Sequence, residues 1–386
     1  MNLEPRVPIV IFAASAAFIF YVLAGYPLCL EWRARRRPRP VRKAPVQASV
    51  TIVLPVWNGE RWLHRKMDSI LRLDYPAKLL QVIVVSDGST DHTDAIAREF
   101  ADRGVELIRI PHQGKAAALN AGIERARGEI VLFTDVRQPM DPSSLRVLLE
   151  CFADDSVGVV SGELVILEGD RREEIDVGMY WRYEKWIRKR QSRVDSVLGA
   201  TGCLYAMRRH LIRPLPPNTL VDDVYLPLSA FFQGYRIILE DRAKAFDRPA
   251  RLGVEFRRKV RTLAGVYQVI GAYPKLLTFS NRMWVDFISH KLGRLLLPYA
   301  LAALAVSGFW LPGICKHVVA AAQALFYSLA ILDLMVPQTW PLKRLSSPAR
   351  TFVTLMAAAL LAAGAIFYPG GRLWTQTHVR EEGDVF

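Results

Sequence analysis

The sequence predicts an α/β domain of doubly wound type flanked by membrane-spanning helices. Three observations support this fold class. Short β-branched runs alternate with helical stretches between Ala44 and about Pro249, which is typical of a mostly parallel sheet covered by helices. Long uncharged segments lie on both sides of this region. Polar turn residues follow the predicted strands, where open α/β sheets bind their ligands.

The first element is an uncharged segment over residues 7–30. It exceeds the roughly 20 residues that a spanning helix needs and lacks a small-residue cleavage site, so we expect a retained anchor rather than a removed signal peptide. Three more segments are long enough to span a bilayer: residues 295–315, 318–336 and 351–371. The middle one carries Asp333. An intramembrane carboxylate is costly and would suggest a functional residue, but we expect Asp333 to lie at a helix end.

The charge balance is basic, with 51 Lys and Arg against 37 Asp and Glu and a formal net charge of +14. Seven of the basic residues lie within residues 33–43, directly after the first apolar segment. This position suits anionic lipid headgroups, and no nucleic-acid-binding motif accompanies the charge. We therefore expect a lipid bilayer as partner and no nucleic acid.

Basic residues also predict the orientation. The positive-inside rule keeps residues 33–43 in the cytoplasm, and Lys343, Arg344 and Arg350 favour the same side for the loop before the last span. With four spans, both chain ends would then lie outside.

Within the α/β region the predicted strands are residues 50–55, 82–85, 105–110 and 130–133. Helices such as residues 61–72 and 93–102 separate them. Residues 257–294 are basic, aromatic and amphipathic, so we expect interfacial helices there. The expected organisation is an N-terminal anchor with its basic segment (1–43), an α/β domain (44–256), interfacial helices (257–294), C-terminal transmembrane helices (295–371) and a polar tail (372–386).

The four cysteines are scattered along the chain, at Cys29, Cys151, Cys203 and Cys315. They form no CxxC pair and no Cys/His cluster at metal spacing, so neither a disulfide framework nor a zinc site is indicated. We expect inert, buried thiols.

Four polar clusters follow the predicted strands. They are PVWNGE at residues 55–60, SDGSTD at 86–91, GKA at 114–116 and TDVRQ at 134–138. A turn carboxylate can bind a base or ribose, an aromatic ring offers a stacking face, and a lysine at a helix N-terminus suits a diphosphate. Each cluster alone is better explained as a turn or helix cap. Their occurrence in order, each after a strand, favours a nucleotide site.

The ordered set, continued by GATGCLYA and LVDDVYLPLSAFFQGYRI, resembles the inverting family 2 glycosyltransferases of GT-A fold. The best likeness is to membrane synthases of cellulose, hyaluronan and chitin oligosaccharides, over about residues 50–265. The resemblance implies a Rossmann-like nucleotide-sugar domain on the cytoplasmic side of a bacterial inner membrane. It also implies a UDP-sugar donor and a glycan or lipid-linked acceptor, and it is compatible with a partner subunit for export.

The resemblance implies roles for single residues on the donor side. Trp57 stands where the family's aromatic residue stacks on uracil, and Asp87 where a carboxylate binds the nucleoside. Lys115 matches a residue near the phosphates of the nucleotide. Pro55 and Glu60, in the first cluster, complete the expected nucleotide-sugar site.

Asp135 matches the first aspartate of the family's Asp-x-Asp signature, which holds Mg²⁺ or Mn²⁺ on the diphosphate. The second aspartate is replaced by Arg137. A guanidinium cannot ligate a cation, but it can neutralise diphosphate charge itself. We therefore expect a metal at Asp135 that depends on phosphate and water for its other ligands.

Asp222 and Asp223 match the family's Thr-Glu-Asp signature, with Asp223 in the position of the catalytic base. An acceptor hydroxyl must lose its proton as it attacks the anomeric carbon, opposite the departing nucleoside diphosphate. One positioned carboxylate accomplishes this in a single, inverting displacement. Adjacent acids also suit a helix N-terminus, which does not exclude catalysis.

The family's Gln-x-x-Arg-Trp signature aligns with RKVRT at residues 258–262. Arg261 keeps its place and is expected near the diphosphate, whereas Arg258 and Thr262 replace the glutamine and the acceptor-side tryptophan. Gly202, in the GATG segment, could belong to a close-approach loop near the acceptor, or the segment could be only a tight turn. Trp181 could hold a sugar, and an interfacial anchor explains it equally well.

The sequence thus predicts a membrane-bound hexosyl- or N-acetylhexosaminyl-transferase in extracellular or cell-surface polysaccharide synthesis. A processive synthase and a single-transfer enzyme with a polyprenyl-linked acceptor both stay open, and the altered Arg-Trp signature weakens the first. A transporter with a nucleotide-sensing domain is disfavoured because the spans hold no paired charges. A nucleotide-dependent oxidoreductase is disfavoured because no G-x-G-x-x-G follows the first strand.

Overall fold

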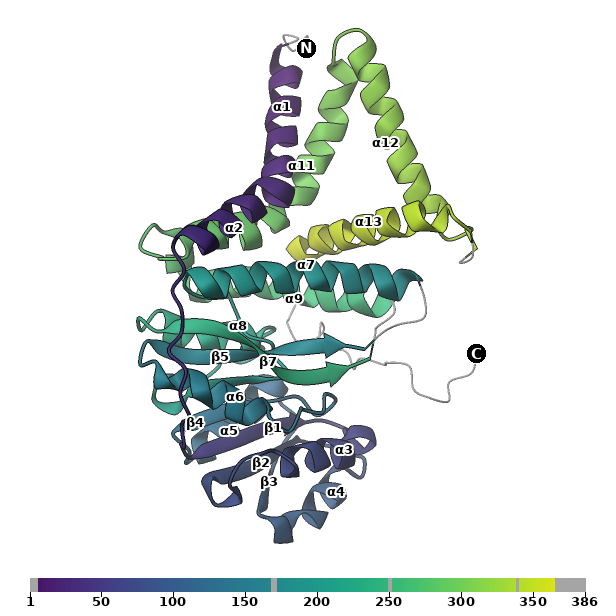
Figure 1. Cartoon of the computed structure of the whole chain (residues 1–386). Helices are drawn as coiled ribbons and strands as arrows, with labels where there is room; N and C mark the ends of the chain where they lie inside the picture. The colour runs from purple at the N-terminus through teal and green to yellow at the C-terminus, as the bar shows by residue number, and fades with distance from the viewer. Residues whose placement is uncertain (1–5, 168–171, 249–251, 338–339, 365–386) are drawn as a thin grey trace. The chain divides into compact units, whose positions relative to one another are not determined.

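The computed structural model describes residues 6–167, 172–248, 252–337 and 340–364 (Figure 1). The expected polar tail and the last seven residues of the expected final span lie outside them. The chain divides into two compact units. The α/β unit comprises Arg37–Leu167 and Arg188–Arg248, and the helical unit contains the rest.

The α/β unit is built on a seven-stranded sheet in the order β3-β2-β1-β4-β6-β5-β7. Its strands are β1 (Val50–Val56), β2 (Leu80–Asp87), β3 (Val105–Ile110), β4 (Ile130–Phe133), β5 (Val157–Ile166), β6 (Tyr205–Arg208) and β7 (Arg236–Asp247). The first four match the strands expected from the sequence and pair in parallel. Their polar turns therefore emerge at one edge, the carboxyl edge of the sheet.

The sheet departs from a purely parallel arrangement at β6. Tyr205, the first residue of β6, pairs with Phe133, the last residue of β4, and β6 runs antiparallel to both β4 and β5. Since β6 starts where β4 ends, the segment that leads into β6 lies at the carboxyl edge. This segment carries Gly202, so the strand reversal brings it to the same edge as the turns after β1, β2 and β4.

Helices cover both faces of this sheet, as a doubly wound fold requires. They are α3 (Glu60–Leu71), α4 (Thr93–Glu99), α5 (Lys115–Arg125), α6 (Ser144–Glu150) and α8 (Asp222–Phe231). On one face, Leu63 and Met67 of α3 join the core with Ile52 and Leu54 of β1. On the other face, α5 packs so closely that a Cβ atom at Gly122 would lie 2.5 Å from Val53.

An extended segment, residues 37–49, leads from α2 to β1 along the α/β unit (Figure 1). Arg39 forms an ion pair with Asp195. Arg42 donates through Nε to the carbonyl oxygen of Ala153 at 2.9 Å. Arg39 and Arg42, two members of the basic cluster expected to face lipid headgroups, thus bind other residues of the α/β unit.

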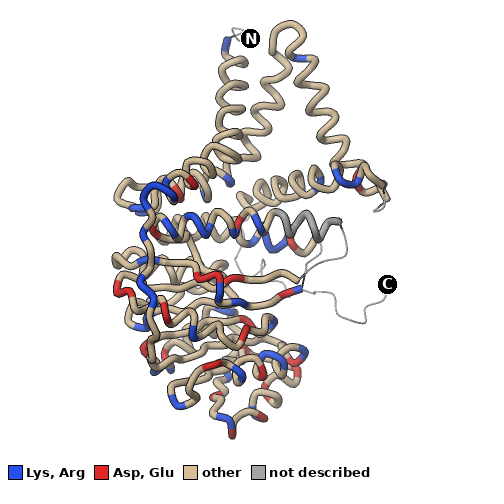
Figure 2. The backbone as a smooth tube through the Cα atoms, viewed as in Figure 1, with Lys and Arg blue, Asp and Glu red and all other residues tan. Residues whose placement is uncertain are grey.

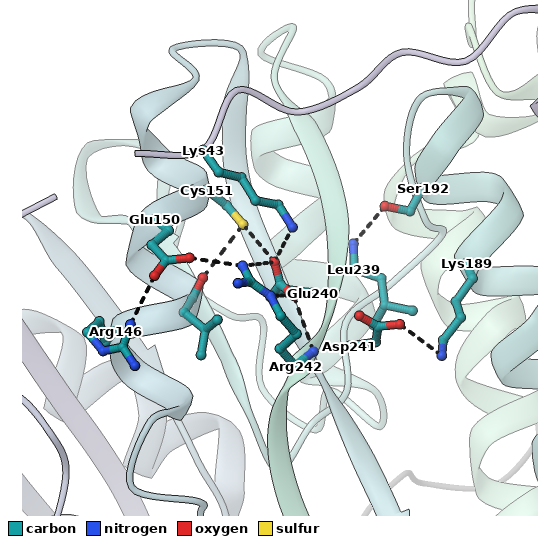
Figure 3. A network of polar contacts seen from close by, with 11 residues as sticks. Lys43, Arg146, Glu150, Cys151, Lys189, Ser192, Leu239, Glu240, Asp241 and Arg242 are labelled. Atoms are coloured by element: carbon teal, nitrogen blue, oxygen red, sulfur yellow. Dashed lines mark hydrogen bonds and ion pairs between the residues drawn. The ribbon is translucent and has the colours of Figure 1, made fainter. Parts of the chain in front are cut away.

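Lys43, the last basic residue of that cluster, reaches Glu240 of β7, whose side chain is 1% exposed (Figure 3). Lys43 Nζ lies 2.5 Å from Glu240 Oε2, Arg242 Nε lies 2.9 Å from Oε1, and Cys151 Sγ donates to Oε2 at 3.4 Å. Burial alone would raise the pKa of Glu240, but hydrogen bonds from Arg242 and Lys43 outweigh it and hold the pKa at about 2.

The helical unit contains α1 (Arg6–Phe20), α2 (Tyr26–Arg36), α9 (Leu252–Ala272), α10 (Trp284–Asp286), α11 (Gly293–Ser307), α12 (Ile314–Leu332) and α13 (Lys343–Gly364). Helix α7 (Arg172–Val194) continues from this unit into the α/β unit. Helix α1 packs along α11, and α13 packs against α9 and α12. Arg33 of α2 holds the buried Asp286 at 2.9 Å.

Four helical stretches are long and apolar enough to cross a membrane: Arg6–Arg36, Trp284–Trp310, Ile314–Leu332 and Lys343–Gly364. Their number and order agree with one N-terminal and three C-terminal spans, and α1, α11 and α12 carry few charges (Figure 2). Asp333 directly follows α12, at a helix end as expected. It is buried, and Lys343 Nζ lies 3.0 Å from its Oδ1.

Candidate active site

The turns after β1 and β2 interlock at the carboxyl edge. Asn58 adopts a positive φ of 47°, and its N–H donates to Ser89 Oγ at 3.1 Å. Its Oδ1 accepts the N–H of Thr90 at 2.8 Å. The N–H of Gly59 donates to Thr93 Oγ1 at 2.8 Å. These bonds fix the two turns, and with them Trp57 and Asp87, relative to one another.

Glu60 belongs to this interlock. Its N–H donates to Asp91 Oδ2 at 3.0 Å, and its own Oε2 accepts the backbone N–H of His92 at 2.9 Å. The backbone N–H and the ring of His92 lower the pKa of Glu60. The geometry therefore gives Glu60 a part in holding the turns, and its expected contact with the nucleotide stays a prediction.

Asp87, the last residue of β2, is 3% exposed and orders the turn before α5. Its two carboxylate oxygens accept the N–H groups of Gln113 at 2.7 Å and Gly114 at 2.9 Å. Gly114 has a φ of 89°, a conformation that favours glycine. Because each carboxylate oxygen has two lone pairs, Asp87 keeps acceptor capacity for a ligand.

Trp57 presents an aromatic face at the same edge. Its side chain is 43% exposed, and its ring stacks on His112 with 4.6 Å between ring centroids and 24° between planes. His112 in turn lies with Nδ1 3.0 Å from the backbone oxygen of Asp87. The pair forms an aromatic surface beside the carboxylate, the combination that a nucleobase and ribose require.

Lys115, the first residue of α5, holds two carboxylates together. Its Nζ lies 2.9 Å from Asp135 Oδ1, in the turn after β4, and 3.2 Å from Asp222 Oδ2, at the start of α8. Burial alone would lower the pKa of Lys115, but Asp135 and Asp222 outweigh it and raise the pKa above its ordinary value. The lysine is therefore a permanent cation at the edge of the sheet.

Asp135 stays ionised for the same reason. Burial would raise its pKa, but Lys115, then Arg137 and Lys66, outweigh it and lower the pKa below its ordinary value. Asp135 therefore lies among three cationic side chains from α3, α5 and its own turn.

Arg137, in place of the second signature aspartate, turns toward β7. Its NH2 lies 2.7 Å from Asp247 Oδ2, and Gln138 Nε2 donates to the same oxygen at 2.9 Å. Nε of Arg137 is buried and has no hydrogen-bond partner among the residues that the structure describes. After pairing with Asp247, Arg137 thus keeps its buried Nε–H as a donor without a partner among the described residues.

A divalent cation, which the resemblance implies, finds few protein ligands here. Within the described part of the chain, no group of three His, Cys, Asp or Glu side chains is placed to hold a metal ion. Asp135 and Asp222 do converge on one cation, the ammonium of Lys115. These residues fit Mg²⁺ or Mn²⁺ where the diphosphate and water complete the shell, which is how Mg²⁺ usually binds nucleotides.

Asp223, the expected base, lies in the first turn of α8 against the segment that leads into β6. The N–H of Ala200 donates to the backbone oxygen of Asp223 at 2.7 Å. A Cβ atom at Gly202 would lie 3.0 Å from Asp223 Oδ2, so the absence of a side chain leaves room for the carboxylate. Asp222 beside it is 5% exposed and faces Lys115. The aspartate pair therefore begins a helix and borders the charged cluster at once.

The structure brings Trp57, Asp87, Lys115, Asp135 and Asp222 into the α/β unit's carboxyl edge, with Pro55 inside β1 just before them. Four further expected site residues, Arg258, Arg261, Thr262 and Trp181, belong to the helical unit. The roles of all the expected site residues stay predictions. Within that unit Thr262 Oγ1 donates to the backbone oxygen of Arg258 at 2.8 Å, an ordinary bond within α9.

Three residues of the site were not expected from the sequence. His112 stacks on Trp57, Asp247 receives Arg137, and the buried Lys66 approaches Asp135 from α3. His112 follows a predicted strand, and Lys66 falls on the apolar stripe of its helix, so both carried a local signal. Asp247 carried none, because it meets Arg137 only through the pairing of distant strands.

Comparison with known proteins identifies the domain. Residues 51–215 match the model of glycosyl transferase family 2. The chain carries a family 2 glycosyltransferase domain. Two curated relatives are the probable glycosyltransferase YdaM of Bacillus subtilis, 23% identical over 62% of this chain, and the poly-beta-1,6-N-acetyl-D-glucosamine synthase of Staphylococcus epidermidis, 24% identical over 57%. The chain spans 58% and 55% of the lengths of these relatives.

The fold extends beyond the matched region. A solved structure of the mannosyltransferase PcManGT from Pyrobaculum calidifontis, in complex with GDP-mannose and Mn²⁺, superposes with a TM-score of 0.72 at 24% identity. The likeness covers 93% of this chain and 99% of that one. It confirms the expected GT-A fold.

Proposed function

We propose that the chain is a membrane-bound, inverting glycosyltransferase. It transfers a sugar from a UDP-sugar to a growing glycan or a lipid-linked acceptor in cell-surface polysaccharide synthesis. The observation that carries this proposal is the cluster of Lys115, Asp135 and Asp222 beside Asp223 at the carboxyl edge. A cation that meets a diphosphate and a carboxylate that takes a proton are the two groups the reaction needs.

The residues of the α/β unit divide the work. Trp57 and Asp87 bind the base and ribose of the donor, and Lys115 and Arg137 neutralise its diphosphate. Asp223 accepts the proton of the acceptor hydroxyl as its oxygen bonds to the anomeric carbon. The bond between that carbon and the diphosphate oxygen breaks on the opposite side, and the nucleoside diphosphate leaves. A divalent cation held at Asp135 would add positive charge beside the leaving group.

The donor's nucleotide and sugar are inferred from the family. The poly-beta-1,6-N-acetyl-D-glucosamine synthase among the relatives supports an N-acetylhexosamine, whereas PcManGT binds GDP-mannose. We propose a UDP-sugar because the resemblance implies one. The stacked pair of Trp57 and His112 offers a flat face on which its base can stack.

The membrane setting supports the acceptor class. The four candidate spans suit an enzyme of the bacterial inner membrane that keeps its catalytic domain in the cytoplasm and works on an acceptor held at the bilayer. Both a processive synthase and a single-transfer enzyme agree with this setting. Thr262, in place of the family's acceptor-side tryptophan, favours the single transfer.

The test is a donor screen on the full chain in lipid nanodiscs, with bacterial lipid extract as acceptor. UDP- and GDP-sugars are each supplied with Mg²⁺ or Mn²⁺, and nucleoside diphosphate release and lipid products are followed by mass spectrometry. We expect release from a UDP-sugar and a product one sugar heavier than its acceptor. A ladder of products would instead favour the processive version.

Asp223→Asn tests the base, with Asp68→Asn on the exposed face of α3 as the matched control. The Asp223 variant should lose about 100- to 10,000-fold in kcat while binding UDP normally, because a single general base contributes on that order. Full turnover in Asp223→Asn would contradict its assignment as the base.

A further inference from the structure

Lys66 is a lysine on the core-facing stripe of α3. Residues Leu63, Met67 and Ile70 form the rest of that stripe and are buried, and Lys66 itself is 1% exposed. A buried ammonium is costly unless it is fully hydrogen-bonded. Burial lowers the pKa of Lys66 to about 8, with Cys203 and Asp135 opposing that shift. Packing alone therefore does not explain why a lysine occupies this buried position.

The ammonium of Lys66 bridges the two ends of the turn after β4. Its Nζ donates to Thr134 Oγ1 at 2.6 Å and to the backbone oxygen of Gln138 at 2.6 Å. The residues between these anchors include Asp135 and Arg137, which meet Lys115 and Asp247. The buried ammonium of Lys66 thus holds together the two ends of the turn that carries Asp135 and Arg137.

The bridge continues to the acceptor side. Thr134 Oγ1 donates to the backbone oxygen of Cys203 at 2.7 Å. A carbonyl oxygen only accepts, so the threonine hydroxyl donates its proton to Cys203. The hydroxyl oxygen must therefore accept the hydrogen bond from Lys66. The direction of every bond in the chain from Lys66 through Thr134 to Cys203 is therefore determined.

Cys203 is next to Gly202, which lies against the carboxylate of Asp223, and Ala200 binds the backbone of Asp223. A polar chain thus runs from the donor turn to the segment behind the expected base. All of its members are in the α/β unit, and Lys66, Thr134 and Cys203 are buried.

We propose that Lys66 is a positioning residue that sets the spacing between Asp135 on the donor side and Asp223 on the acceptor side, without touching substrate. This inference rests on the proposed function. Its physical basis is that a displacement of about 1 Å between reacting groups can lower turnover by about 100-fold. Binding of the nucleoside alone, at Trp57 and Asp87, does not depend on that spacing.

The experiment uses the full-length protein and its donor with three variants. Lys66→Met removes the ammonium at similar length, Thr134→Val removes the hydroxyl at equal shape, and the third combines them. Arg65→Met, one residue earlier on the exposed face of α3, is the matched control. We measure kcat, the donor KM, the Kd of uridine by calorimetry and the melting temperature.

We expect kcat to fall about 10- to 100-fold in both single variants, with the Kd of uridine changed less than about threefold. The double variant should be no slower than the worse single variant, because both break one chain. Arg65→Met should match the wild type. If Lys66→Met does not fold, Thr134→Val still tests the proposal, because this variant retains Lys66 and its hydrogen bond to Gln138.

Wild-type kcat in Thr134→Val, or independent and multiplying effects in the double variant, would overturn the role of Lys66. A loss confined to the melting temperature would also overturn it, since it would make Lys66 structural only. A wild type that turns over no donor would contradict the proposed function and this inference together.

Discussion

The ammonium of Lys115 lies 2.9 Å from Oδ1 of Asp135, so the first residue of α5 meets the turn after β4. Helix α5 and the turn after β4 are thereby joined at the carboxyl edge of the sheet. A third, α8, joins through Asp222. The candidate site is thus a meeting of charges from three separate turns.

Lys115→Met should weaken binding of the donor's diphosphate selectively. A charge-assisted hydrogen bond to phosphate contributes about 1.5–3 kcal/mol, which corresponds to about a 10- to 100-fold loss in affinity. Calorimetry with UDP and with uridine should show this loss for UDP only. Lys78→Met, on an exposed turn, is the control. Equal losses for both ligands would show that Lys115 supports the pocket rather than the phosphates.

Gly202→Ala should impair turnover without impairing nucleotide binding. The new Cβ would lie 3.0 Å from Asp223 Oδ2, so the carboxylate must shift. A shift of a few tenths of an ångström to 1 Å is expected to lower kcat by about 10- to 100-fold. Steady-state kinetics and UDP calorimetry would measure the two effects. Gly271→Ala, where nothing lies within 4 Å of the added atom, should leave both unchanged.

Glu240→Gln should destabilise the protein in a pH-dependent way. The folded pKa of Glu240, about 2, lies below its ordinary 4.5, so its ionised form stabilises the fold fully above pH 4.5 and loses this effect as the pH falls toward 2. At pH 7 the loss is expected to be about 3 kcal/mol, because Lys43 and Arg242 lose a buried partner.

Melting temperatures of the wild type and Glu240→Gln from pH 7 to pH 2.5 would check this. The gap between them should narrow below pH 4.5. Glu124→Gln, on the exposed face of α5, should melt like the wild type throughout. A gap that stays constant with pH would mean that the carboxylate's charge contributes nothing.

Cys151 and Cys203 should resist alkylation while the protein is folded. Both are buried, and burial raises the pKa of each thiol to about 12, so almost no thiolate exists at pH 8. Iodoacetamide followed by peptide mass mapping should find both unmodified before unfolding in guanidinium and both modified after it. Labelling of either cysteine in the folded protein would contradict the buried network.

Local patterns were enough to predict four of the seven strands of this sheet. The β-branched runs of β1 to β4 and the polar turns after them identified the carboxyl edge, because strand formation and turn chemistry depend on neighbouring residues. Lys115, Asp135 and Asp222 do meet there. Strands β5, β6 and β7 were not predicted, and β6 runs opposite to its neighbours because it starts where β4 ends.

Long-range contacts explain the other omissions. Asp247 reaches Arg137 only because β7 pairs with β5 at the far edge of the sheet. Lys43 looked like a lipid-facing charge until Glu240, far along the chain, became its partner. Contacts between residues this far apart in the sequence depend on how the strands are ordered in the folded sheet. Local sequence patterns therefore do not predict them.

The interlocked turns after β1 and β2 have a consequence for redesign. Asn58 and Gly59 form hydrogen bonds with Ser89, Thr90 and Thr93. The conformation of each turn therefore depends on the other turn. A chimera that imports the first turn from a relative, to change the nucleotide accepted, would leave the second without its partners. Recombination between relatives should therefore succeed when the crossover points lie outside both turns and fail when one falls between them.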